Sequence, residues 1–122
     1  MTPRPRAAAT LAMSASLITA ATGCTDAGPP IAGQAAARTL IDVRTPAEFA
    51  GGHLRNALNI DVQSPTFTSD VGRLDRSGSY LIYCRSGNRA ESAITIMRTL
   101  GFTDLINGGG YDQLKSTGVP TA

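Results

Sequence analysis

The sequence contains few residues of the kinds that bind metals or stack on nucleic-acid bases. Its 122 residues include one histidine (His53), two cysteines and no tryptophan, and aromatic residues make up 5% of the chain. A single histidine excludes a catalytic zinc site built from several histidines, and the few aromatic residues argue against a base-stacking surface. The chain also lacks a P-loop lysine motif and a dinucleotide-binding glycine pattern. We therefore expect no metal, no cofactor and no nucleic-acid partner.

The chain has no excess of charge once its first residues are set aside. Residues 1–23 begin with Arg4 and Arg6, continue with an uncharged, weakly apolar stretch and end in small residues, which is the order of an export signal. The whole chain has 11 basic and 9 acidic residues, so without these two arginines 9 of each remain. The apolar stretch is short and rich in Ala, Ser and Thr, which argues against a membrane span.

The end of this signal resembles a bacterial lipobox, in which a cysteine is lipidated and becomes the mature N-terminus. Small residues directly precede Cys24, with Ala21 where leucine is usual. We predict a lipoprotein of the cell envelope, anchored to the membrane at Cys24 and facing outside the cytoplasm. Plain secretion is the first alternative and an uncleaved anchor the second. A lipid on Cys24 leaves Cys84 as a single thiol in an exported protein, which favours a functional role for Cys84.

The rest of the chain predicts a tether and one folded domain. Segment 24–37 is rich in Gly, Pro and Ala and predicts a flexible tether, whereas 38–122 is long enough for one domain. Segments typical of strands (39–43, 57–61, 79–83 and 104–106) alternate with segments that are helical (46–50, 88–100 and 111–115) or helical to irregular (64–74). This alternation predicts an α/β fold with a parallel sheet covered by helices on both faces. The three glycines 108–110 predict a flexible turn before the last helix.

The stretch YCRSGNRA interrupts the apolar pattern between a strand and the longest helix. It predicts Cys84 at the carboxyl end of the strand, the edge where ligands bind in open α/β sheets. Backbone N–H groups and the helix dipole stabilise a thiolate there. Such a loop suits an anion attached to sulfur, either a phosphate or a persulfide or thiosulfate-like group. His53 could pair with Cys84 as in a cysteine protease, but its position between a helix stop and a strand favours a structural hydrogen bond.

Two motifs in this order resemble the rhodanese family of sulfurtransferases: DVRTPAEFAGGHLRNALNI at 42–60 and YCRSGNRA at 83–90. The resemblance continues into GFTDLINGGGYDQL at 101–114. It implies a small three-layer α/β fold with a central parallel sheet of about five strands between helices, although no first strand is evident before Thr39. It also implies an enzyme that moves sulfane sulfur from a thiosulfate-like donor to a thiol or cyanide acceptor through a Cys84 persulfide. We expect a monomer.

The resemblance also implies roles for individual residues. Cys84 would be the nucleophile, and Asp42 and Arg44 would brace the site by ion pairing and hydrogen bonding. The loop whose backbone N–H groups surround the sulfur would consist of Arg85, Ser86, Gly87, Asn88 and Arg89. Asn56 stands where the family usually has glycine, and asparagine tolerates the same left-handed backbone. Leu114 stands where a tryptophan is common.

Loop length separates the competing chemistries. Four residues lie between Cys84 and Arg89, as in sulfurtransferase members of the family, whereas cysteine phosphatases have five and a wider cradle for phosphate. Glu91 follows on the helix and is expected to face solvent or pair with an arginine, so no general acid is evident. A cysteine phosphatase or arsenate reductase is therefore the less favoured reading. A persulfide carrier or redox-sensing binding module, which would also need Cys84, remains the main alternative.

Overall fold

The computed structural model of the protein describes residues 2–3 and 30–122. The predicted signal residues Arg4 and Arg6 and the predicted lipidation site Cys24 lie outside the described residues. None of the helices within the described part of the chain is both long and apolar enough to cross a membrane.

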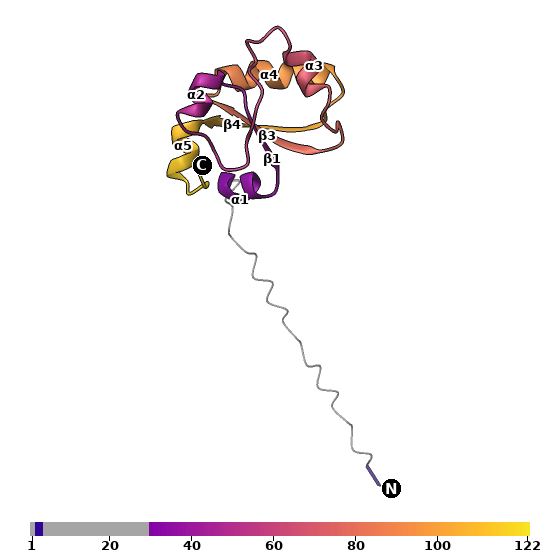
Figure 1. Ribbon diagram of the computed structural model, residues 1–122. Helices are drawn as coiled ribbons and strands as arrows, with labels where there is room; N and C mark the ends of the chain where they lie inside the picture. Colours follow the sequence, from indigo (N-terminus) through magenta and orange to yellow (C-terminus); the bar gives the residue numbers. More distant parts are fainter. Residues whose placement is uncertain (1, 4–29) are drawn as a thin grey trace.

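Helices and strands alternate along the described chain (Figure 1). In order they are α1 (Ile31–Ala36), β1 (Thr39–Asp42), α2 (Pro46–Ala50), β2 (Leu58–Asn59), α3 (Phe67–Val71), β3 (Ser79–Cys84), α4 (Asn88–Thr99), β4 (Asp104–Gly110) and α5 (Tyr111–Ser116). The strands form one parallel sheet in the order β2-β1-β3-β4. The predicted α/β class is therefore confirmed, with β1 and β3 at the centre of the sheet.

Two expectations about the start of the domain differ from the structure. The sheet formed by residues 30–122 has four strands rather than about five, and part of the segment expected to be a tether is α1. The sequence IAGQAA contains mainly good helix formers and few β-branched residues, so it folds as a helix. Ala35 is buried, and Ile31 and Ala32 pack against the core. The folded unit therefore begins before Arg38.

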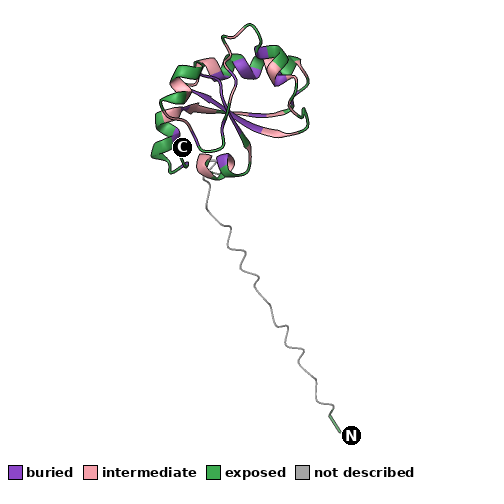
Figure 2. Ribbon diagram, viewed as in Figure 1, coloured by how far each residue is buried: buried purple, intermediate pink, exposed green. Residues whose placement is uncertain are grey.

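The sheet separates two apolar clusters, and Figure 2 shows that much of its central part is buried. Successive side chains of a strand point to opposite faces, and β3 follows this rule: Tyr80, Ile82 and Cys84 belong to one cluster, and Leu81 and Tyr83 to the other. Helices α3 and α4 cover the first face, while α1 and α5 lie on the opposite side (Figure 1). Since β3 is buried on both faces, its last residue is fixed in position by the core.

The glycines expected to form a flexible turn are instead part of β4, which is a correction. Gly109 and Gly110 pair with Tyr83 and Cys84, with a register irregularity between Ile82 and Tyr83. A Cβ atom on Gly110 would overlap the carbonyl oxygen of Arg85. Glycine is required at Gly110 because the backbone of the Cys84 loop passes directly beside β4.

Two unusual positions noted in the sequence fit the fold. Asn56 has a φ of 66°, which confirms the expected left-handed backbone. Leu114 is 1% exposed and lies in the cluster beneath α5, so leucine fills a core position there.

Candidate active site

Cys84 lies at the carboxyl end of β3, and α4 begins four residues later at Asn88. Its side chain has no exposed surface, and it is a free thiol. The residues that follow it are more open: Arg85, Ser86 and Asn88 are exposed. A reactant must therefore reach the sulfur through the loop rather than across the core.

Backbone N–H groups converge on the sulfur of Cys84. The Gly87 N–H donates to Sγ at 2.8 Å. Burial raises the pKa of the Cys84 thiol, but hydrogen bonds from backbone N–H groups outweigh burial and bring the pKa below its ordinary value. The contributing N–H groups belong to Ala90, Ser86, Gly87 and Arg89. This loop therefore stabilises a negative charge on sulfur.

Gly87 has the backbone conformation that makes this convergence possible. It precedes α4 with a φ of 100°, a left-handed conformation that glycine adopts without steric cost. A left-handed residue followed by right-handed helical residues turns successive N–H groups to one side and forms an anion-binding nest. Of the loop expected from the sequence, 85–89, the N–H groups of Ser86, Gly87 and Arg89 bond to the sulfur of Cys84, and they are joined by that of Ala90, which the sequence reasoning did not assign to the loop.

Asp42 and Arg44, expected to brace the site, form a buried ion pair at the end of β1. Their side chains are 0% and 6% exposed, and Arg44 Nη2 lies 2.7 Å from Asp42 Oδ2. Arg44 also donates through its Nε and its backbone N–H to Asp42, and through Nη2 to the carbonyl of Gly52. The guanidinium lies 4.5 Å from the ring centroid of Tyr111. The pair thus links β1 to the loop after α2 and to α5.

Arg89 is bound by a residue that the sequence reasoning did not assign to the site, Glu48. Arg89 Nη1 and Nη2 donate to the two carboxylate oxygens of Glu48 at 2.7 and 3.0 Å. The Arg89 hydrogen bond, opposed by burial and helped by Thr45, lowers the pKa of Glu48 to about 2. Glu48 also forms a capping box with Thr45, and the T-x-x-E spacing was a readable signal for that box. The contact with Arg89 joins residues 41 positions apart, so sequence spacing could not predict it.

A small polar cleft opens beside the loop. It has a volume of about 270 Å³, and its lining includes Arg44, Glu48, Arg85 and Tyr111. Arg44 and Glu48 are engaged in ion pairs there, whereas Arg85 extends from the loop itself. Asp112 adds a second carboxylate, so the lining has two basic and two acidic side chains, and the volume suits a small reactant.

His53 lies outside this group of residues. Its Nδ1 donates to the carbonyl of Phe49 at 2.9 Å, and its ring stacks on the Phe49 ring at a centroid distance of 3.6 Å. These contacts tie the loop after α2, as the sequence pattern indicated. Within the described part of the chain, no group of three or more His, Cys, Asp and Glu side chains is arranged to hold a metal ion.

The model of the rhodanese-like domain family matches residues 30–117. The chain belongs to the rhodanese-like domain family. It is 33% identical over 94 residues to the chloroplastic thiosulfate sulfurtransferase 16 of Arabidopsis thaliana, covering 66% of this chain and 77% of that protein. It is 29% identical over 79 residues to the thiosulfate sulfurtransferase PspE of Escherichia coli, covering 65% and 76%.

A solved structure agrees with this assignment. An E. coli rhodanese described as containing anions superposes with a TM-score of 0.58 at 26% identity, covering 70% of this chain and 98% of that one. The match with the family begins at residue 30, so it includes α1 as well as the strands around Cys84. This rhodanese-like domain thus has relatives that are named as sulfurtransferases.

Proposed function

We propose that this rhodanese-like domain is a sulfurtransferase that carries sulfane sulfur as a persulfide on Cys84. The observation that supports it best is the set of backbone N–H groups directed at Sγ, led by Gly87 at 2.8 Å. Relatives named thiosulfate sulfurtransferase and a rhodanese structure described with anions support the same chemistry. Thiosulfate is the donor that these names suggest.

The reaction consists of two displacements at sulfur. The Cys84 thiolate attacks the sulfane sulfur of thiosulfate, the bond between the two sulfur atoms of thiosulfate breaks, and sulfite leaves with the electron pair. The terminal sulfur of the persulfide then carries the negative charge, which the loop N–H groups stabilise. Cyanide or a thiolate attacks this terminal sulfur, forms thiocyanate or a new persulfide, and releases the Cys84 thiolate.

The same geometry argues against phosphate or arsenate chemistry. Arg89 Nη1 and Nη2 donate to the two carboxylate oxygens of Glu48. These two donors are therefore not directed at an oxyanion above the sulfur. The loop from Cys84 to Arg89 is short, and its N–H groups close around a single atom. A terminal sulfur fits this space better than a tetrahedral oxyanion.

The experiment is persulfide trapping on the purified domain. After incubation with thiosulfate, mass spectrometry of the intact protein should show one added sulfur atom, located on Cys84 by peptide mapping. Cyanide should then remove it and yield thiocyanate over many turnovers. Loading without turnover by small acceptors would support a persulfide carrier instead. Hydrolysis of aryl phosphates without persulfide formation would overturn the proposal.

We also propose that the protein is exported and anchored through a lipid on Cys24, on the basis of the lipobox-like sequence alone. Replacing Cys24 by Ala should move the protein from the membrane fraction to the soluble fraction and leave the sulfur transfer of the domain unchanged. Retention of this variant in the membrane would indicate an uncleaved apolar anchor.

A further inference from the structure

Asn107 is a residue of β4 whose side-chain amide bonds to the loop and to the first turn of α4. Its Nδ2 donates to the carbonyl of Gly87 at 3.0 Å and to Glu91 Oε2 at 3.2 Å. Its Oδ1 accepts from the N–H of Gly109 at 2.8 Å. The orientation of the amide is fixed by its partners, because a flipped amide would place its oxygen against two acceptors. Glu91 is exposed to solvent, as the sequence predicted, and its carboxylate is also a partner of Asn107.

Gly87 is the residue that this contact controls. Its N–H donates to Cys84 Sγ, while its carbonyl accepts both from Asn107 and from the N–H of Glu91 at 3.0 Å. The N–H and the carbonyl belong to the two peptide planes that meet at Gly87. Since glycine has no side chain to restrict its rotation, a hydrogen bond that fixes the carbonyl also limits how far the N–H can turn away from sulfur.

The irregularity in β4 brings Asn107 and Gly87 together. The register between β3 and β4 shifts after Asn107, where Gly108 is the additional residue. The Gly109 N–H then turns back to Asn107 Oδ1 two residues before it, as in an Asx turn. A Cβ atom on Gly87 would lie 3.3 Å from the Cα of Gly109. The loop and the bulge are therefore in direct backbone contact, and bulges commonly re-aim side chains near active sites.

We propose that Asn107 is a positioning residue that holds the Gly87 peptide so that its N–H points at the sulfur of Cys84. The consequence for sulfur transfer rests on the proposed function above, whereas the consequence for the thiol is independent of it. Without this contact the loop should spend less time in the conformation in which the Gly87 N–H donates to Cys84 Sγ. The thiolate, and the terminal sulfur of a persulfide, would then lose part of their stabilisation.

The test compares Asn107→Ser with the unchanged protein. Serine can still accept from the Gly109 N–H, so the turn in β4 is kept, but its hydroxyl is too short to reach the Gly87 carbonyl. Alkylation rate of Cys84 is measured against pH. We expect the midpoint of the profile to move to higher pH, and kcat for transfer from thiosulfate to fall by about two- to threefold with a smaller change in KM, because the contact is exposed and water can replace part of it. At high pH the alkylation rate reaches a plateau, whose height reports how accessible the buried thiol is. The plateau is therefore compared between the proteins separately from the midpoint.

Glu91→Gln is the matched control. It removes the carboxylate next to Asn107 but leaves the bond from Asn107 to Gly87, so the alkylation midpoint should not rise. A purely structural role for Asn107 would lower the melting temperature of Asn107→Ser without moving the midpoint, and that result would overturn the inference. A raised midpoint in a protein that shows no sulfur transfer would retain the role of Asn107 and refute the proposed function. If Asn107→Ser does not fold, hydrogen exchange at the Gly87 amide of the unchanged protein decides: slow exchange supports the inference, and fast exchange contradicts it.

Discussion

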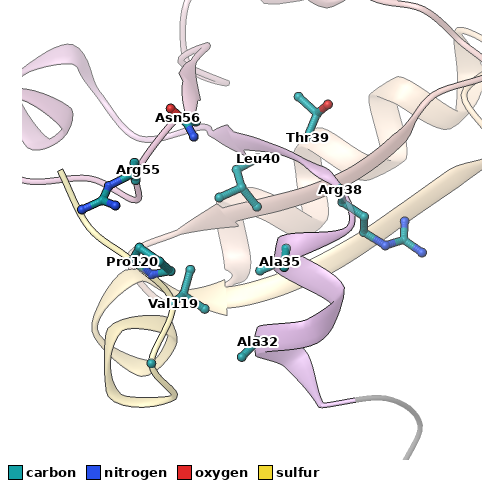
Figure 3. A pocket seen from close by; sticks show the side chains of 11 residues that line it. Ala32, Ala35, Arg38, Thr39, Leu40, Arg55, Asn56, Val119 and Pro120 are labelled. Atoms are coloured by element: carbon teal, nitrogen blue, oxygen red, sulfur yellow. The ribbon is translucent and has the colours of Figure 1, made fainter.

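At the carboxyl end of the sheet, charged side chains form ion pairs beside a small cleft. The amino end has a cavity that is larger and more apolar than this cleft. The groove at the amino end has a volume of about 530 Å³, about twice that of the cleft beside Cys84. Figure 3 shows Ala32 and Ala35 of α1 on one side of this groove and Val119 and Pro120 on the other. The described residues that line it include no cysteine, histidine or carboxylate. In this domain the candidate site is therefore indicated by directed N–H groups and buried charges, not by cavity size.

Each end of the sheet also has an ion pair, and the two pairs differ in burial. At the carboxyl end Asp42 and Arg44 are almost fully buried. At the amino end Arg38 Nη1 lies 2.6 Å from Asp104 Oδ1, and the Asp104 side chain is 46% exposed. Water can replace a lost partner at the exposed pair but not at the buried one. Substitutions at the buried pair should therefore cost more stability than substitutions at the exposed one.

Cys84→Ser should remove at least about 1,000-fold of the sulfur-transfer activity, because a serine hydroxyl is far less acidic than a thiol and forms no persulfide. The fold should persist, since serine is smaller than cysteine and the surrounding N–H groups can bond to its oxygen. The measurement is thiocyanate production, with a thermal melt as the control for folding. Activity of the serine variant near that of the unchanged protein would exclude Cys84 as the sulfur carrier.

Asp42→Asn should destabilise the domain by about 3 kcal/mol, because it leaves the buried guanidinium of Arg44 without its charge partner. Asp104→Asn changes an exposed pair at the other end of the sheet and should cause a clearly smaller loss. Urea denaturation of both variants gives the comparison. Equal losses would show that burial does not distinguish the two ends.

The sequence could predict the position of Cys84 because the information is local. An apolar strand pattern ends at Cys84, and a helical pattern begins within a few residues, so the loop between them is defined by neighbouring residues. The parallel sheet followed from the alternation of strands and helices. The helix α2 could be predicted because Thr45 and Pro46 are a typical helix start.

The parts that sequence reasoning missed depend on contacts between distant segments. Glu48 meets Arg89 and Asn107 meets Gly87 only after the sheet has formed. The sequence predicts a turn at the glycines of β4 because glycine usually weakens strands. In the structure these glycines lie in the strand and allow the Cys84 loop to pass close by. The sequence of α1 predicts a tether because its composition is simple. Its packing against the domain depends on the burial of Ala35, which the composition does not reveal.

Glu48→Gln should lower stability by about 1 kcal/mol near neutral pH, because glutamine keeps the capping box but loses the charge that pairs with Arg89. The pKa of Glu48 is about 2 in the folded protein, below its ordinary value of 4.5. A lowered folded-state pKa contributes stability above the unfolded-state value, and this contribution disappears as the pH falls towards 2. The difference between the two proteins should thus be constant above pH about 5 and shrink below it. A difference that grows in acid would contradict the assignment.

Gly33→Ala tests the amino end of the sheet, where the smallest effect is expected. Gly33 is an exposed residue within α1, and an added Cβ atom would meet nothing within 4 Å. Alanine should therefore stabilise the domain by about 0.5–1 kcal/mol through its higher helix propensity. Sulfur transfer should stay unchanged because Cys84 lies at the opposite end of the sheet.

Gly118→Ala is the matched control for Gly33→Ala. Its added Cβ atom would also meet nothing within 4 Å, but Gly118 has a φ of 95°, which strains any residue with a side chain. Gly118→Ala should lower the stability of the domain, whereas Gly33→Ala should raise it. Because both positions have free space, the difference would show that backbone conformation, not space, decides the effect. Thermal melts and sulfur-transfer rates of both variants are needed. If Gly33→Ala altered transfer more than about twofold, outside the range expected for a surface change, the two ends of the sheet would be coupled, and the separation between groove and site would be wrong.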